Sequence, residues 1–253
     1  MRASIIITGD KKENFLKDTI ESCLKQNCRD FEIILVYNKL HNFKHLKEIF
    51  KNKIIFKKIK KKIKNPVRDQ LYKIYEGLKT AKGKYIFLLD GDDIFKKNKL
   101  ISILNIKKKN CLFLDDHLIL KRGKYIYKNN KFYKKYLIYK LLFNSWPDKI
   151  CTSCISGQKE LFTKFYESIK IQKIKFLAID ILLTIFYIEK LYKVSKILTV
   201  KKIVQDSVDN NYLYLFSKIY WQRRIEQHKF FKNFKKKKYT LEYYFCILMT
   251  YIF

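Results

Sequence analysis

The sequence predicts an α/β fold in which a mostly parallel β-sheet is flanked by helices on both faces. Short apolar runs rich in β-branched residues, typical of buried strands, recur along the first ninety residues. Between them, apolar residues recur at helical spacing, as on the buried face of an amphipathic helix. Because strand and helix alternate with short connections, the strands are expected to run parallel, with helices covering both faces.

The expected strands of the first half are 3–8, 31–36, 53–56 and 85–89. The expected helices between them are marked by apolar stripes that begin at Leu16, Phe43 and Leu71. The second half is less regular, with strands expected at 111–114, 118–120 and 125–127 and helices at 132–143, 159–169 and 176–192. We expect one α/β domain over 1–205 and a basic, aromatic, helical extension over 206–253.

The charge balance is strongly basic, with 56 Lys and Arg against 23 Asp and Glu, for a formal net charge of +33. Such an excess attracts polyanions, including nucleic acid, anionic lipid and phosphorylated substrates. The joint richness in Lys, Ile, Asn, Phe and Tyr also fits an AT-rich genome, so both explanations stay open. Neither a signal peptide nor an apolar stretch long enough to span a membrane is recognised, and a cytoplasmic location is expected.

The clearest chemical signal is LLDGDDIF at 88–95, where a buried strand leads directly into Asp90, Gly91, Asp92 and Asp93. In parallel α/β sheets, ligands bind beyond the carboxyl ends of the strands. Neighbouring carboxylates repel one another unless a cation or hydrogen-bond donors compensate them, and hard divalent cations prefer oxygen ligands. Glycine allows the backbone to approach a ligand closely. The alternative is a plain acidic turn in which Asp93 caps the next helix.

At these residues the chain resembles the family 2 glycosyltransferases of the GT-A fold, a Rossmann-like α/β architecture. Asp90-Gly91-Asp92 stands where this family carries its aspartate-x-aspartate motif. SIIIT, FLKDTIESCLKQ and DFEIILV are similar to the family's first strand, first helix and second strand, and RDQLYKIYEGLKTAKGKYIFLLDGDD at 68–93 to its Arg-led helix and acidic motif. The resemblance covers roughly residues 3–210 and makes 1–205 the catalytic domain.

The resemblance implies a metal-dependent transfer of sugar from a nucleotide-sugar donor, UDP-linked in our interpretation, to a hydroxyl group. Asp92 would coordinate Mg²⁺ or Mn²⁺ at the sugar diphosphate, where the metal neutralises the leaving group, and Asp90 would face the ribose or the metal. Asp180, in FLAIDILL, falls where the family places its catalytic base, which implies inversion in a single displacement. A buried structural acid is the alternative role for Asp180.

Gly91 is expected to contact the donor, because it lets the backbone approach closely. Five further donor contacts are expected, at Thr8, Asp10, Tyr37, Asn38 and Arg68. After the first strand the chain reads Thr8, Gly9 and Asp10, and Asp10 is a candidate for holding the ribose. Tyr37 and Asn38 stand where the family usually has two aspartates; the ring can stack on a pyrimidine and the amide can bond its edge. Arg68 opens its helix and could reach a phosphate or the acidic motif, with a plain exposed arginine as the alternative.

Tyr37 and Asn38, together with further departures, favour a rival hypothesis, a catalytically weakened glycosyltransferase-like scaffold. Ile179 replaces the acid that usually precedes the base, and Lys202 and Val204 replace an Arg and a His. A second rival is a nucleic-acid-binding protein that uses the positive charge. The acidic cluster makes nucleic acid an unlikely partner, because it puts negative charge where a polyanion would pass.

Two basic runs lie at 57–64 and 232–238, and the second has aromatic neighbours and precedes the apolar segment 243–253. Rings and cations together suit an anionic membrane surface or single-stranded nucleic acid. An acceptor that is a cell-surface glycan or a lipid-linked sugar favours the membrane. The expectation is therefore a cytoplasmic enzyme of polysaccharide biosynthesis that is peripheral on the inner face of the membrane.

Overall fold

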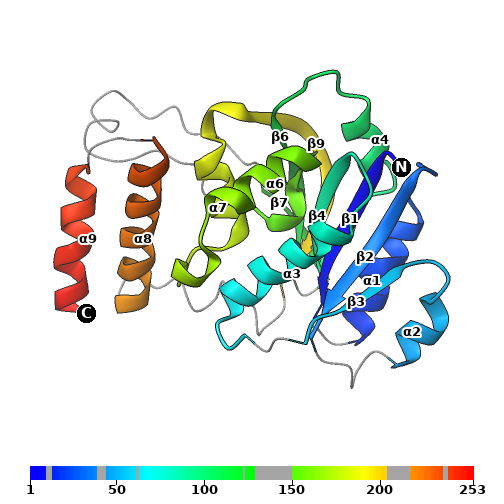
Figure 1. Ribbon diagram of the computed structural model, residues 1–253, viewed down its shortest axis with the longest axis horizontal. Coiled ribbons are helices and arrows are strands. Elements are labelled where there is room, and N and C mark those ends of the chain that lie inside the picture. Colours follow the sequence, from blue (N-terminus) through cyan, green and yellow to red (C-terminus); the bar gives the residue numbers. More distant parts are fainter. Residues whose placement is uncertain are drawn as a thin grey trace.

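The computed structural model describes residues 1–9, 13–38, 44–60, 63–121, 123–128, 150–203, 217–235 and 239–253 (Figure 1). Three expectations lie outside these residues: the ribose contact of Asp10, the replacement at Val204 and the helix expected at 132–143.

The described strands form one sheet in the order β3-β2-β1-β4-β8-β6-β9-β5, with β7 paired to the second half of β6, beyond the residues that pair with β8. The strand bounds are β1 (Ala3–Gly9), β2 (Phe31–Tyr37), β3 (Ile55–Lys58), β4 (Tyr85–Asp90), β5 (Ile94–Phe95), β6 (Leu112–Lys121), β7 (Lys124–Lys128), β8 (Ile155–Gln158) and β9 (Leu191–Lys202). Strands β1 to β4 run parallel, as do β6 and β9, whereas β8, β7 and β5 pair antiparallel with their neighbours. The half expected to be parallel is parallel, and the sheet as a whole is mixed.

Helices cover both faces of the sheet (Figure 1). Their bounds are α1 (Glu13–Leu24), α2 (Lys44–Phe50), α3 (Pro66–Thr80), α4 (Lys99–Leu104), α6 (Lys159–Ser168), α7 (Ile179–Phe186), α8 (Lys218–Lys235) and α9 (Leu241–Ile252), with 3₁₀ helices η1 (Thr152–Cys154), η2 (Ile171–Lys173) and η3 (Ile188–Lys190). Because side chains alternate along a strand, Ile5 and Ile7 pack with α1, α2 and α4, whereas Ile6 packs with α3, α6 and α7. Two hydrophobic cores result, one on each face.

Two sequence expectations in the second half are wrong in detail. The helix expected at 176–192 ends at Phe186, and after η3 the chain becomes the long strand β9. The two strands expected at 111–114 and 118–120 are one continuous strand, β6, which pairs with β9 through an irregular register near Asp115 and Asp116. Periodicity alone cannot tell a short buried helix from a buried strand. The apolar residues from Leu191 onward therefore fitted a helical pattern, although they pair with β6 in the sheet.

The C-terminal segment is helical, as expected, and it stands at one end of the molecule (Figure 1). Helix α8 packs against α7, where the rings of Phe186 and Phe234 meet edge to face with centroids 4.9 Å apart. Helix α9 packs against α8. No helix among the described residues is both long and apolar enough to cross a membrane.

A fully buried ion pair lies beside the carboxyl ends of the strands. The Lys99 ammonium donates to Asp115 Oδ1 at 2.6 Å, to the Ser153 carbonyl oxygen at 2.7 Å and to Thr199 Oγ1 at 2.7 Å. Lys99 and Asp115 are both 0% exposed. A buried ammonium is tolerated only when each of its protons has an acceptor, and these three oxygens provide that.

We therefore predict that Asp115→Leu lowers the free energy of unfolding by about 3–5 kcal/mol, because the Lys99 charge stays buried without its counter-ion. The double variant Lys99→Met/Asp115→Leu should lose clearly less, because it buries no charge. Denaturant unfolding measures both. As a control, Glu21→Gln breaks an exposed pair with Lys25 and should cost under about 1 kcal/mol. Equal losses in the single and double variants would contradict the prediction.

Candidate functional site

The carboxyl ends of β1, β2 and β4 meet at one edge of the sheet and bring together residues far apart in sequence. The parallel register places Thr8 opposite Asp90 and Gly9 opposite Tyr37. Asn38 directly follows β2, and Gly91 directly follows β4. Thr8, Tyr37, Asn38, Asp90 and Gly91, all expected donor contacts, thus lie along this one edge.

The Asp90 carboxylate is oriented by side chains from two elements. Its Oδ1 accepts from Gln70 Nε2 of α3 at 2.8 Å and from Thr8 Oγ1 at 3.3 Å. The Asp90 backbone N–H donates to the Ser153 hydroxyl at 3.0 Å. Gln70 and Ser153 are site residues that the sequence reasoning missed. Gln70 lies two positions after Arg68, and Ser153 belongs to the 3₁₀ helix η1 that precedes β8.

Asp92 and Asp93 are both buried, at 7% and 2% exposed. Asp93 Oδ2 accepts from Ser153 Oγ at 2.6 Å and from Cys151 Sγ at 3.2 Å, while Oδ1 accepts from the Lys202 backbone N–H at 3.0 Å. Burial, together with the charges of Asp90 and Asp92, raises the pKa of the Asp93 carboxyl to about 7. The helix-cap alternative for Asp93 is wrong, because β5 follows it and α4 begins only at Lys99.

Gly91 is required by the close approach of two strands. Its backbone N–H donates to the Thr8 carbonyl oxygen at 3.1 Å, and a Cβ at this position would lie 2.9 Å from that oxygen. Any side chain would therefore push the acidic turn away from β1. The absence of a side chain keeps Asp90 and Asp92 next to the end of β1.

Tyr37, the last residue of β2, and Asn38, the residue after it, differ in their contacts. The Tyr37 ring is 3% exposed and packs edge to face on Phe56, which leaves little of the ring for a bound base, and burial raises the pKa of its hydroxyl. Asn38 Nδ2 donates to Asp69 Oδ1 at 2.5 Å, and Asp69 in turn pairs with Lys73 at 2.6 Å. Asn38 Oδ1 is buried and has no hydrogen-bond partner among the described residues. The amide is thus fixed with its acceptor oxygen unused.

Arg68, in the first turn of α3, contacts the segment that leads towards Asp180. Arg68 Nε donates to the Ile174 carbonyl oxygen at 2.7 Å, and Asn65, the N-cap of α3, donates from Nδ2 to the Lys175 carbonyl oxygen at 2.9 Å. These contacts hold the segment that leads into α7, whose first turn carries Asp180. The Asp180 side chain is partly exposed. Gln70, rather than Arg68, makes the contact from α3 to the acidic motif.

This edge combines an acidic turn after a central strand with polar groups at the ends of two neighbouring strands, as expected of a GT-A catalytic domain. The family model described as "Glycosyl transferase family 2" matches residues 4–166. The chain belongs to glycosyl transferase family 2. The matched range contains every described candidate except Asp180.

Three curated relatives, each described as an uncharacterised glycosyltransferase, match part of this chain. Glycosyltransferases of Rickettsia conorii and Rickettsia felis are 32% and 31% identical over 129 residues, which is 49% of this chain and 21% of each relative. A Methanocaldococcus jannaschii glycosyltransferase is 33% identical over 103 residues, 38% of this chain and 33% of the relative. The chain thus matches about a fifth to a third of the length of these relatives.

Solved structures of S. aureus TarS share the fold of this glycosyltransferase. TarS 1–349 in complex with UDP has a TM-score of 0.64 at 15% identity, and TarS 1–349 in complex with UDP-GlcNAc a TM-score of 0.65 at 16% identity. Both comparisons cover 99% of this chain and 70% of the TarS chain. The mixed sheet flanked by helices is therefore a GT-A fold.

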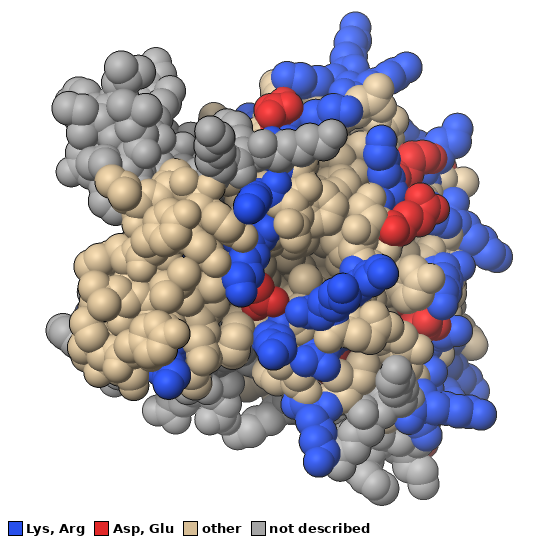
Figure 2. All heavy atoms as spheres, turned by 60° about the vertical axis from the view of Figure 1, so that its left-hand side comes forward, with Lys and Arg blue, Asp and Glu red and all other residues tan. Residues whose placement is uncertain are grey.

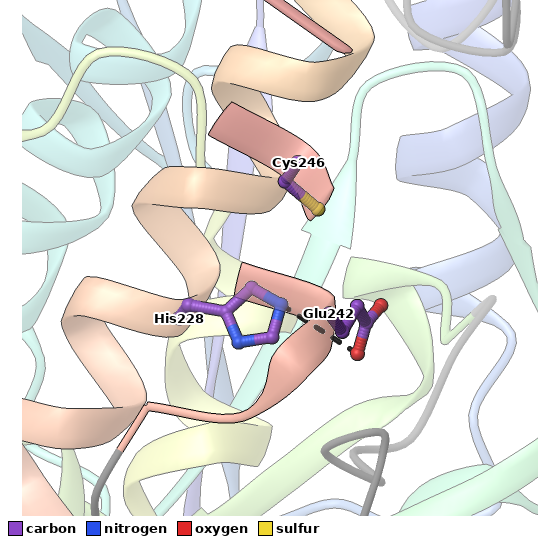
Figure 3. A group of neighbouring side chains, drawn as sticks. All are labelled: His228, Glu242 and Cys246. Atoms are coloured by element: carbon purple, nitrogen blue, oxygen red, sulfur yellow. Dashed lines mark ion pairs between the residues drawn. The ribbon is translucent and has the colours of Figure 1, made fainter. Parts of the chain in front are cut away.

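A second polar cluster joins α8 to α9 (Figure 3), the two helices at one end of the molecule (Figure 1). His228, Glu242 and Cys246 each offer a possible metal-ligating atom, and these atoms lie within 4.8 Å of one another. Arg224 forms a close ion pair with Glu242 and a hydrogen bond with Cys246. Because the guanidinium already supplies the positive charge beside these groups, the cluster is better explained as a polar contact that fixes the two helices.

His228 makes this cluster sensitive to pH. Burial and the neighbouring Arg224 charge lower the pKa of its imidazole to about 4, so the folded chain holds it neutral. The unfolded chain takes up the proton near pH 6.5, and stability is therefore lost as pH falls from about 6.5 towards 4. We predict a loss of up to about 3 kcal/mol over this window from His228.

Denaturant unfolding at pH 7 and at pH 4 measures this loss, and His228→Gln should reduce the difference between the two. His45→Gln, at an exposed site on α2, is the matched control and should leave the difference unchanged. The same pH dependence in His228→Gln as in the unmodified chain would refute the assignment.

Proposed function

We propose that this glycosyltransferase moves a hexose or related sugar from a UDP-linked donor to a hydroxyl of a cell-surface glycan or lipid-linked acceptor. The observation that carries the proposal is the acidic turn at the carboxyl edge, with Asp90 held between Thr8 and Gln70 and Asp92 buried beside it. Ligands of parallel α/β sheets bind at this edge. The complexes of TarS with UDP and with UDP-GlcNAc support a uridine-linked donor.

The residues of the acidic turn fit a divalent cation, Mg²⁺ or Mn²⁺. Three carboxylates lie within four positions, and two of them are buried, where like charges are costly unless compensated. We propose Asp92 as the metal ligand, with Asp90 as a second ligand or as the ribose contact. When bound, the metal would supply the Lewis acidity that neutralises the departing nucleoside diphosphate.

Donor recognition would use the ends of β1 and β2. The buried Asn38 Oδ1 is suited to accept an N–H from a pyrimidine edge, because its amide nitrogen is already held by Asp69. Tyr37 would contribute an apolar wall beneath the base. Asp10 remains our candidate for the ribose and Arg68 for a phosphate, and Gly91 keeps the turn against β1.

Asp180 would act as the general base and remove the proton from the acceptor hydroxyl as that oxygen attacks the anomeric carbon. Attack on the face opposite the leaving group would invert the configuration at that carbon. The position of Asp180 in the first turn of α7, a helix whose preceding segment is bound to α3, supports this role because the segment is fixed to the catalytic edge. A base must lie within hydrogen-bond reach of the proton that it removes.

We predict that Asp92→Asn weakens Mn²⁺-dependent UDP binding by roughly 100-fold or more, because even indirect support of a metal typically contributes 10- to 100-fold. Calorimetry of UDP with and without Mn²⁺ measures this. Asp30→Asn makes the same chemical change at the opposite edge of the sheet, directly before β2, and should bind normally. Unchanged affinity in Asp92→Asn would remove Asp92 from the metal site.

For the base, we predict that Asp180→Asn lowers turnover by about 10²- to 10⁴-fold while donor affinity and melting temperature stay close to those of the unmodified chain. Turnover is measured with a panel of nucleotide sugars and acceptors in the presence of Mn²⁺. Turnover within a few-fold of normal would exclude Asp180 as the base, and a loss of melting temperature would make it a structural acid. An unmodified chain that binds UDP and turns over no donor would be a catalytically weakened scaffold instead.

A further inference from the structure

The outermost helix, α9, exposes a continuous apolar face. Six large side chains on it are between 51% and 84% exposed: Leu241, Tyr244, Phe245, Leu248, Tyr251 and Ile252. Their spacing of three and four residues places them along one side of the helix. We call this set the α9 outer face. Single exposed hydrophobic residues are ordinary on a protein surface, but a contiguous apolar patch marks an interaction site.

Contacts with α8 fix which side of α9 points outward. Tyr243 and Cys246 are buried between the helices, and Arg224 of α8 forms the close ion pair with Glu242. Phe245, the least exposed of the six, lies at the border of the outer face, where its ring also meets Trp221 of α8 edge to face with centroids 5.6 Å apart. Since the polar and buried positions of α9 face α8, the outer face cannot turn inward without breaking these contacts.

The exposed charges of α8 are positive, and one of them lies beside α9: Lys232 Nζ is 4.1 Å from the ring centroid of Tyr239, which stacks on Tyr243 of α9. The acidic side chains of α8 and α9 are Glu226 and Glu242, and both are engaged internally: Glu226 accepts from the backbone N–H groups of Lys175 and Phe176, and Glu242 pairs with Arg224. Lys229 and Lys232 of α8 are exposed. Figure 2, which brings this side forward, shows a broad area of uncharged side chains, with Lys and Arg gathered around and beyond it.

We propose that the α9 outer face, with Lys229 and Lys232, docks the chain on an anionic lipid surface. An apolar helix face inserts between headgroups, aromatic rings sit at the headgroup level, and neighbouring cations meet the lipid charge. The 12 residues of α9 are about 18 Å long at 1.5 Å per residue, short of the roughly 30 Å core of a bilayer, so the helix lies in the interface. A second copy of this chain is disfavoured as the occupant, because it would bring equal positive charges together.

Docking through α9 would hold the enzyme on the surface that carries a lipid-linked acceptor. Only this purpose rests on the proposed function. Binding to vesicles is measured without nucleotide or acceptor, so its outcome is separate from any result on donor binding or turnover.

The test is co-sedimentation of the full chain with vesicles of phosphatidylcholine and phosphatidylserine, and with vesicles of phosphatidylcholine alone. The unmodified chain should bind the anionic vesicles, and less strongly as salt is raised. The triple variant Leu248→Gln/Tyr251→Gln/Ile252→Gln, which changes no charge, should bind about tenfold or more weakly at every salt concentration. Lys229→Gln/Lys232→Gln should bind several-fold more weakly at low salt only.

Two matched controls separate this face from general stickiness and general charge. Tyr125→Gln/Tyr127→Gln removes two exposed rings from β7, and Lys47→Gln/Lys51→Gln removes two exposed lysines from and beside α2; both should bind like the unmodified chain. Melting temperatures confirm that all variants are folded. Normal vesicle binding by the triple variant, or no binding by the unmodified chain, would overturn the proposal. So would light scattering that shows a dimer converted to a monomer by the triple variant without any vesicle binding, since a second copy would then cover the face.

Discussion

The ammonium group of Lys99 is buried among oxygens from Asp115, Thr199 and the backbone of Ser153, and the geometry of the acidic turn depends on it. By holding the Ser153 carbonyl, Lys99 fixes the residue whose hydroxyl accepts from the Asp90 backbone and donates to Asp93. The network links α4, β6, β9 and η1 to the turn after β4. A buried charge with full hydrogen bonding is rigid, because any displacement leaves a polar group without a partner.

Rigidity matters at this turn because it concentrates negative charge in a strongly basic chain. Lys and Arg far outnumber Asp and Glu on the face that Figure 2 shows, yet the carboxylates of Asp92 and Asp93 are buried at the carboxyl edge of the sheet. Hydroxyl, thiol and backbone N–H donors compensate Asp93, while Thr8 and Gln70 orient Asp90. Under the function that we propose, these fixed polar groups would receive a cation and a diphosphate without rearrangement, and such preorganisation lowers the barrier of a group transfer.

The C-terminal helices extend the same layered arrangement outward. Phe230 and Phe231 of α8 join the hydrophobic core on the α7 side of the sheet, and α9 is attached to α8 through the polar cluster around Glu242. Each layer buries one face of a helix and leaves the other for the next layer. Among the described residues no further layer covers α9, and six of its large apolar side chains are exposed.

The N-terminal half of the fold follows from local pattern, because β1, β2 and β4 are largely apolar runs of the kind that a parallel sheet buries. The acidic motif, the glycine beside it and the position of the candidates at the strand ends were recognisable for the same reason. The sequence did not reveal β8, which is only four residues long, or that apolar residues after 190 form the strand β9. Both segments form strands because their backbones hydrogen-bond to neighbouring strands, β8 to β4 and β6, and β9 to β6 and β5.

For the site, the sequence alone determined which residues end the central strands, and hence the motif Asp90-Gly91-Asp92 and its neighbours Thr8 and Asn38. Only the tertiary structure decided which side chains reach them. Gln70 rather than Arg68 contacts Asp90, and Asp69 holds Asn38. Ser153, which contacts the Asp90 backbone, lies 63 positions further along the chain. The physical reason is that strand ends are set by local burial, whereas hydrogen-bond partners are set by which distant backbone segments the two cores bring to the same edge.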